Sequence, residues 1–270
     1  MIILLSLVNV FLLFIVISSD IEEKNAATYR TEALVKVLSE NGIALNTDIV
    51  LPDSIPSLLS LKRDLETEKH NISALIGSCS AEDMGGNSYY YHGEDGAAKF
   101  RGTGEFEISM NSGAIPTGKD PVTTAKAVLK KLNIEAGDIE PLVTDDGTNV
   151  TVTLCCSLDG TTIYNEKISF NFNSTYLWYI SGTRPLDTKY SVQSSENYPD
   201  SVTILMQFLE FVNDTGAVCS EIKALKIEYY MSSAVSENCT LRPVWCVETN
   251  SGLYYIDAVS GQAENVESSS

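Results

Sequence analysis

Few residues in this sequence belong to the types that carry out catalysis or bind metals. The chain has two histidines, His70 in the polar segment TEKHNIS and His92 in the segment YYYHGEDG. Glu94 and Asp95 stand beside His92, and the three side chains could recruit a cation, although a hairpin tip that exposes charges is the simpler interpretation. Because two histidines are too few for most zinc sites, we expect neither a metal nor another cofactor.

The other residues that could do chemistry are better explained by backbone structure. Asp145 and Asp146 precede Gly147, which is typical of a turn, and no calcium-binding loop of the D-x-D-x-D-G type surrounds them. Gly102 and Gly104 lack the following helix that a phosphate-binding loop needs. The sequence also has no nucleophile signature. We therefore expect no catalytic residues and a protein that is not an enzyme.

The composition indicates a folded, acidic protein. The 270 residues carry a formal charge of -18, with 44% hydrophobic and 20% charged residues. A packed globular chain has such a composition, and so negative a chain repels nucleic acid and anionic lipid. The spacing of the six cysteines selects no pairing. The number of disulfides is left open between zero, one and more. A bond from Cys219 to Cys239 or to Cys246 is the favoured pairing.

The first segment, residues 1–19, is a nearly unbroken apolar run (IILLSLVNVFLLFIVI) that no basic residue precedes. Its length suits an uncleaved anchor, a cleaved signal or, least of all, a buried core helix. Asp20, Glu22 and Glu23 follow at once, which places the amino end in the cytoplasm. We expect a single-pass transmembrane anchor in the cell membrane, with a cytoplasmic N-terminus and extracellular C-terminal domains.

Beyond this segment, hydrophobic periodicity predicts a helix followed by a small antiparallel meander, three times. Helices are expected over residues 26–41, from Pro121 and after Pro199, while Leu61–Glu68 is expected as a strand. Asp159 and Gly160 form the strongest hairpin signal. The pattern predicts an α+β fold, in which an N-terminal transmembrane helix precedes tandem modules of a helix and an antiparallel sheet.

The expected domains follow from these modules. They are the transmembrane anchor (1–19), a first external α+β module (20–118), a second helix-meander module (119–190), a third helix-meander module (198–261) and a disordered tail (262–270). Residues 119–261 could also form one domain.

Aromatic residues on the predicted strands are the best candidates for contacts with a partner. Trp178, Trp245 and Tyr254 each have an aromatic or apolar neighbour in the sequence. Because side chains alternate along a strand, one member of each pair is expected to face the core and the other to face solvent or a partner. Neighbouring loops could instead cover the exposed members.

Three segments carry a resemblance to a known family. They are the apolar run with its asparagine (LLSLVNVFLLFIV), the hairpin SLDGTTIYNEKISFNF with the following WYISGTRPL, and the end, LRPVWCVETNSGLYYIDAVSG. Their order resembles the YycI/YycH accessory regulators of a cell-wall sensor histidine kinase, especially the divergent clostridial members. The last segment also looks like the closing hairpin of PepSY-type modules.

The resemblance implies a non-enzymatic, membrane-anchored regulator of a two-component system. Its partners would be the sensor histidine kinase or a sister regulator, contacted through the membrane helix and the external domains. Asn9, near the middle of the apolar run, is then expected to form an interhelical hydrogen bond. The alternative is a PepSY-like binding or inhibitory module that acts on an external peptidase or a cell-wall ligand.

Overall fold

The computed structural model describes residues 26, 28–46, 49–52, 54–193, 198–232 and 238–265. These residues belong to two compact units, and the chain passes from one to the other more than once. Unit 1 consists of three segments, which are the chain up to Ser54, Tyr198–Lys226 and the part that begins at Trp245. Unit 2 consists of Ile55–Asn197 and Ile227–Val244.

The first half of unit 2 is a helix followed by a four-stranded antiparallel meander. Its elements are β2 (Leu59–Lys62), α2 (Leu65–Ile76), β3 (Ser80–Asp83), β4 (Ser88–His92), β5 (Gly96–Arg101) and β6 (Glu105–Met110). Asp64 caps α2, because its carboxylate accepts hydrogen bonds from the amides of Glu66 and Thr67. The helix ends at Gly77, which has a φ of 81°.

The second half of unit 2 also begins with a helix that antiparallel strands follow. Its elements are α3 (Pro121–Lys131), β7 (Glu135–Ala136), β8 (Leu142–Asp145), β9 (Val150–Leu158), β10 (Thr161–Phe172), β11 (Leu177–Thr183) and β12 (Tyr190–Val192). Asp120 caps α3 and Pro121 opens it, as the sequence predicts. The predicted hairpin is also confirmed, since Asp159 and Gly160 join β9 to β10 with φ values of 48° and 76°.

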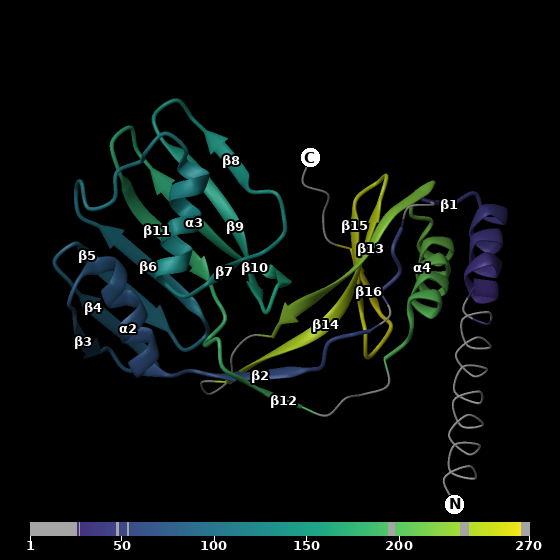
Figure 1. Cartoon of the computed structure of the whole chain (residues 1–270), viewed down its shortest axis with the longest axis horizontal. Coiled ribbons are helices and arrows are strands. Elements are labelled where there is room, and N and C mark those ends of the chain that lie inside the picture. Colours follow the sequence, from purple (N-terminus) through teal and green to yellow (C-terminus); the bar gives the residue numbers. More distant parts are fainter. Residues whose placement is uncertain are drawn as a thin grey trace, which may run out of the picture. The chain divides into compact units, whose positions relative to one another are not determined.

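The two meanders join into one antiparallel sheet through their last strands. β6 pairs with β11, and Ile108 lies directly opposite Ile180 at the centre of this pair. The strand order is then β3-β4-β5-β6-β11-β10-β9-β8. α2 packs on β4 and β5, α3 packs on β7 and β9, and Figure 1 shows both helices on the same face of the sheet.

The two faces of this sheet differ in chemistry, because side chains alternate along each strand. The face under α2 and α3 is apolar, and residues such as Phe106, Ile108, Phe170 and Ile180 are buried there. The alternate residues form the opposite face, which no helix of unit 2 covers. We call this surface the helix-free face.

Two long strands belong to both units, and one of them pairs with β10 at a bulge. β13 (Glu221–Met231) and β14 (Asn238–Thr249) begin or end in unit 1 and reach into unit 2. Between Ile163 and Lys167 the register of β10 shifts, and Ile163 pairs with Tyr229 of β13. Asn165, inside the bulge, bonds the main chain of Met231 with both groups of its amide, at 2.8 and 2.9 Å. In unit 2, β14 also pairs with β2, and β2 with β12.

Unit 1 combines two helices with the remaining strands. They are the helix over residues 28–40, β1 (Ala44–Leu45), α4 (Ser201–Thr215), β15 (Leu253–Asp257) and β16 (Ala263–Asn265). Asp200 caps α4 and also forms an ion pair with Arg30 at 2.7 Å. The Phe208 ring of α4 meets the Tyr254 ring of β15 at 5.2 Å, which places the apolar stripe of α4 on these strands.

The expectation of an α+β fold with an N-terminal transmembrane helix is wrong. The described chain is mostly β-sheet, because each helix of unit 2 is followed by several strands and β13 and β14 are long. Among the helices that the structure describes, none has the length and apolar character that a membrane span needs. Residues 1–19, where the sequence places the anchor, lie outside the described residues.

Two local expectations also need correction. Leu61–Glu68, expected as a strand, contains the end of β2 and the start of α2, because the Asp64 cap begins a helix inside it. Residues 263–265, expected within a disordered tail, form β16 by pairing with β15. All six cysteines are free thiols.

Candidate functional site

A bulge in β11 places two consecutive aromatic side chains on the helix-free face. Asn171 of β10 lies opposite Tyr179, and Phe172 lies opposite Leu177, so Trp178 is an extra residue in β11. An extra residue interrupts the alternation of the strand, so that two neighbouring side chains can point to the same side. The Trp178 and Tyr179 rings are stacked, with centroids 5.5 Å apart and planes 26° from parallel. We call these two residues the aromatic pair.

The aromatic pair is accessible to a partner. Trp178 is 39% exposed, and the Tyr179 side chain is half-buried against its neighbours. An exposed tryptophan next to a tyrosine offers a large apolar contact area with few rotatable bonds, and such residues commonly carry much of the energy at binding surfaces.

Uncharged hydrogen-bonding side chains continue from the aromatic pair across the sheet. The strand register sets them in two rows, which are Ser109–Tyr179–Asn171–Thr151–Thr144 and Ser181–Ser169–Thr153. Within the rows, Thr151 donates to Asn171 at 3.0 Å, and the hydroxyl groups of Thr153 and Ser169 are 3.0 Å apart. These side chains are half-buried or exposed, so their remaining donors and acceptors are open to a ligand.

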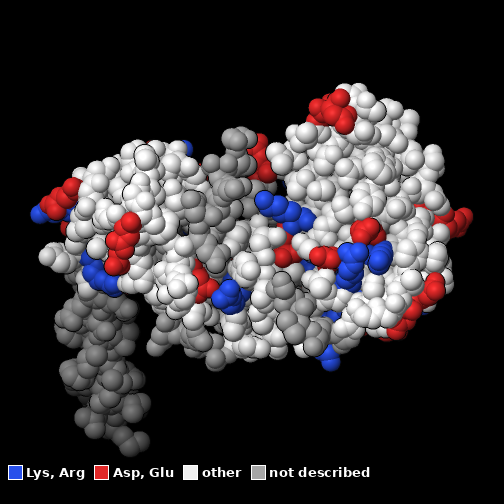
Figure 2. Space-filling model, turned by 180° about the vertical axis from the view of Figure 1, so that it is seen from behind, with Lys and Arg blue, Asp and Glu red and all other residues white. Residues whose placement is uncertain are grey.

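Three charged side chains near the aromatic pair form one paired group. Arg101 donates to Glu105 at 2.9 Å and to Glu107 at 3.3 Å, and Glu107 also accepts from the Tyr179 hydroxyl at 3.3 Å. Burial, followed by the neighbouring Glu107 carboxylate, raises the pKa of Tyr179, so this phenol stays a proton donor at neutral pH. Figure 2, seen from behind, shows unit 2 covered mostly by residues other than Lys, Arg, Asp and Glu.

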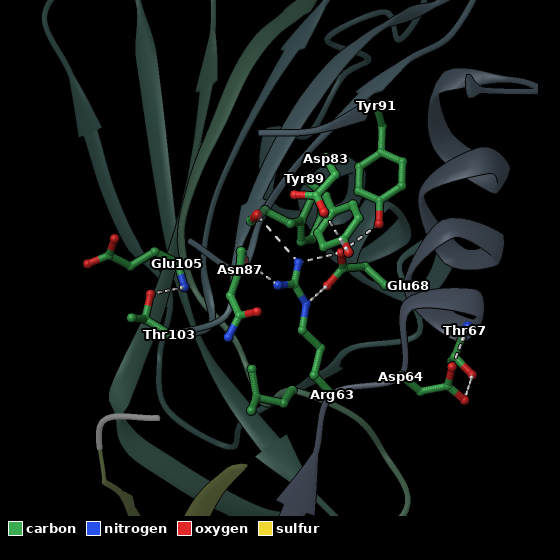
Figure 3. Close-up of polar contacts among 12 residues, drawn as sticks. Arg63, Asp64, Thr67, Glu68, Asp83, Asn87, Tyr89, Tyr91, Thr103 and Glu105 are labelled. Carbon is green, nitrogen blue, oxygen red and sulfur yellow. Dashed lines mark hydrogen bonds and ion pairs between the residues drawn. The ribbon is translucent and has the colours of Figure 1, made fainter. Parts of the chain in front are cut away.

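Unit 2 also contains a buried ionic cluster, between α2 and the sheet. Glu68 accepts two hydrogen bonds from Arg63, at 2.7 and 3.0 Å, one from the Tyr91 hydroxyl at 2.7 Å, and one from Arg184. Figure 3 shows Arg63, Glu68 and Tyr91 pointing toward one another. Arg63, Glu68 and Arg184 are 6%, 4% and 8% exposed, so these charges lie in the interior.

The electrostatics of the ionic cluster suit a structural role. Burial lowers the pKa of Arg184, and the Glu68 carboxylate opposes that effect. Burial and Glu68 also raise the pKa of Tyr91, so the phenol remains a donor. Because both oxygens of Glu68 already accept hydrogen bonds from guanidinium groups, this carboxylate cannot act as a general base.

The space around the ionic cluster also argues against a substrate site. The cavity that Glu68 and Arg184 line has a volume of about 30 Å³, roughly the share of one water molecule in the liquid. A wider groove of about 620 Å³ opens beside the start of α2 and β12. Acidic and basic residues are mixed along it, namely Lys62, Arg63, Asp64, Glu66, Asp187 and Lys189. The groove therefore favours neither an anion nor a cation.

The cysteines of β9 are not activated thiols. Cys155 and Cys156 are buried, and burial raises the pKa of both. Among the described residues, no three His, Cys, Asp or Glu side chains come together in a way that could hold a metal ion. His92 lies at the surface, 3.9 Å from Glu82, and its ring is tilted by 52° to the Tyr90 ring.

The residues that the sequence singles out lie in different places. Trp178 is exposed on the helix-free face, whereas Trp245 and Tyr254 are 1% and 6% exposed and belong to the core of unit 1. Among these three, Trp178 is the residue whose side chain can touch a partner directly. Asn9 lies outside the described residues.

Sequence reasoning missed two features of the site. The alternation rule assigns Trp178 and Tyr179 to opposite faces, and the bulge that unites them depends on pairing with β10. The ionic cluster joins residues as distant as Glu68 and Arg184. The one local signal was Asp64 followed by Glu66 and Glu68, which is typical of a helix start and would have placed Glu68 on α2.

Comparisons with known proteins add a structural likeness. No family profile matches the sequence, and no curated protein matches it. The chain is similar in structure to an uncharacterized protein from Eubacterium rectale, with 12% sequence identity and a TM-score of 0.48. The similarity covers 83% of this chain and 90% of that chain.

Proposed function

We propose that this chain is a binding module without catalysis and that its partner docks on the helix-free face of unit 2. The observation that carries the proposal is the aromatic pair, Trp178 and Tyr179, which the β11 bulge holds together on an accessible surface. A strand that packed only for stability would have no need to bring both rings to the side away from the core.

The surroundings of the aromatic pair support the same conclusion. Rows of hydroxyl and amide groups extend over the neighbouring strands, and Arg101 is paired with Glu105 and Glu107. Such a surface can fix the orientation of a bound molecule with hydrogen bonds while the two rings supply apolar contact. In the ionic cluster, by contrast, both oxygens of Glu68 are already occupied by hydrogen bonds from arginines, and the cluster lies on the other side of the sheet.

Site-specific photocrosslinking tests this proposal. Trp178 is replaced by the photoreactive residue p-benzoylphenylalanine, and the same replacement at Lys126, exposed on α3, serves as the matched control. On irradiation of cells that make the chain, we expect adducts of higher mass from position 178 and not from position 126. Adducts from position 126 alone, or from neither position, would contradict the proposal.

The control of a sensor histidine kinase stays a prediction from the sequence resemblance. Binding of a partner on the helix-free face is compatible with such a regulator and also with a PepSY-like module. The identity of the crosslinked partner separates the two.

A further inference from the structure

We propose that the ligand of the helix-free face is an uncharged linear glycan, bound with its sugar rings stacked on the aromatic pair. This inference rests on the proposed function, because it names the class of molecule that the same surface would bind.

The first argument is the chemistry of the aromatic pair. A pyranose ring has an apolar face of C–H groups, and this face stacks on flat aromatic rings. The Trp178 and Tyr179 rings are stacked with their planes 26° from parallel, so Tyr179 supports one side of the indole and the exposed part of Trp178 is left for a sugar ring. The 39% exposure of Trp178 leaves room for contact.

The second argument is the kind of hydrogen bonds that the surrounding residues can make. Sugar hydroxyl groups both donate and accept, and so do the side chains of Ser, Thr and Asn. Asn171, Thr151, Ser169 and Thr153 stand next to the aromatic pair along the two rows. A polyhydroxyl ligand can therefore replace the water bound to these groups with hydrogen bonds of the same kind.

The third argument is the extent of the surface. The first row runs over β6, β11, β10, β9 and β8, and neighbouring strands lie about 4.8 Å apart, so the row is about 20 Å long. A surface of this length suits an extended chain of sugars better than a compact small molecule, which would need a pocket.

Other occupants fit the helix-free face less well. A peptide that adds a strand needs a sheet edge, and the aromatic pair lies in the interior of the sheet. Nucleic acid is repelled by the net charge of -18, and Arg101, a cation beside the aromatic pair, is already paired with two glutamates. An amphipathic helix needs an apolar groove, and the rows beside the aromatic pair are polar.

The two tryptophans make a direct test possible, since Trp178 is exposed and Trp245 is 1% exposed. The full chain is titrated with cellohexaose and with chitohexaose while its fluorescence is recorded. We expect at least one of these glycans to shift the emission to shorter wavelength and to protect it from acrylamide quenching. The Trp178→Phe variant should lose the emission shift, because Trp245 has no contact with solvent to lose.

Substitutions then locate the site. Trp178→Ala should weaken glycan binding, measured by calorimetry, by on the order of tenfold or more, and Asn171→Ala should weaken it several-fold. Tyr190→Ala is the matched control, because Tyr190 is 41% exposed on β12, away from the aromatic pair, and its loss should leave binding unchanged. An unchanged unfolding midpoint shows that each variant is folded.

The outcomes separate this inference from the proposed function. Absence of binding to both glycans, together with protease-sensitive adducts at position 178, would overturn the glycan inference and leave a protein partner on the same face. Absence of both glycan binding and adducts would overturn the two together. Glycan binding that survives Trp178→Ala and Asn171→Ala would also overturn the inference, since the site would lie elsewhere.

Discussion

At the scale of single residues, Glu68 is the side chain on which the interior of unit 2 depends most. Its carboxylate is 4% exposed and is the one anion among the described partners of Arg63 and Arg184 in the ionic cluster. Replacement of Glu68 by Gln would leave two buried guanidinium groups without a counter-charge, and removal of one partner of a buried ion pair costs about 3 to 5 kcal/mol. We expect a loss of that size in the free energy of unfolding, measured by urea denaturation.

The matched control for this prediction is Glu66→Gln. Glu66 lies on the same helix and is exposed, so its replacement should change the free energy of unfolding by less than about 1 kcal/mol. Equal losses in the two variants would mean that general helix electrostatics, and not the ionic cluster, fix α2 to the sheet.

A second buried carboxyl group, Glu166, makes stability depend on pH. Glu166 is 5% exposed in the β10 bulge, and among the described residues its Oε2 atom has no hydrogen-bond partner. Burial raises the pKa of Glu166 from 4.5 to about 7. Between these two values the native state keeps a proton that the unfolded state has released, so the free energy of unfolding falls as the pH rises through this window.

The Glu166→Gln variant tests this pH dependence. Between pH 5 and pH 8 the wild-type chain should lose up to about 3 kcal/mol through this group, and the variant should lack that loss. Denaturation curves at both pH values give the difference directly. A variant with the same pH slope as the wild-type chain would assign the slope to other groups, and Glu94→Gln, at an exposed position, should leave the slope unchanged.

At the scale of elements, the close approach of β10 and β11 depends on Gly182. A Cβ atom at this position would collide with the main-chain oxygen of Lys167 and come within 2.8 Å of the Ile168 Cα. Gly182→Ala should therefore push the two strands apart and reduce the free energy of unfolding by about 2 to 4 kcal/mol. Thermal denaturation followed by circular dichroism measures this loss.

Gly113→Ala is the control that separates steric crowding from backbone strain. Gly113 has a φ of 82°, but a Cβ there would meet nothing within 4 Å. Its replacement should cost only the strain of a left-handed residue, about 1 to 2 kcal/mol. A loss at Gly182 no larger than that at Gly113 would show that the strands accommodate the extra atom.

The elements also show what local sequence can predict. Asp120 with Pro121 and Asp159 with Gly160 fix a helix start and a hairpin through their own backbone preferences, and both predictions are confirmed. The β11 bulge is different, because it exists only relative to the register of β10. The sequence could therefore indicate Trp178 as a contact residue but could not indicate that Tyr179 shares its face.

At the scale of the whole molecule, β13 and β14 should make unfolding cooperative. Each strand is continuous from one unit into the other, so loss of either unit frees part of a strand on which the other depends. In the Trp178→Phe variant, Trp245 fluorescence reports on unit 1 and far-ultraviolet circular dichroism reports on the whole chain. We expect the same midpoint from both signals, and two separate midpoints would show that the units unfold independently.

The interleaving of the units is also the part of the fold that sequence patterns could not supply. Periodicity along the chain detects a helix and the strands that follow it, and it led to an α+β expectation. The larger share of β-sheet and the return of β13 and β14 to unit 2 depend on pairings such as Ile163 with Tyr229. Contacts over such distances in sequence leave no periodic signal.

The pairing of β6 with β11 suggests an evolutionary origin for the sheet of unit 2. Each half places its helix before its strands, and the halves meet antiparallel through β6 and β11, with Ile108 opposite Ile180. A two-fold symmetric homodimer of a single half would have this geometry, so duplication and fusion of one ancestral gene is the simplest origin of the sheet. The two halves differ in chemistry, because the first half holds most of the ionic cluster and the second holds the aromatic pair.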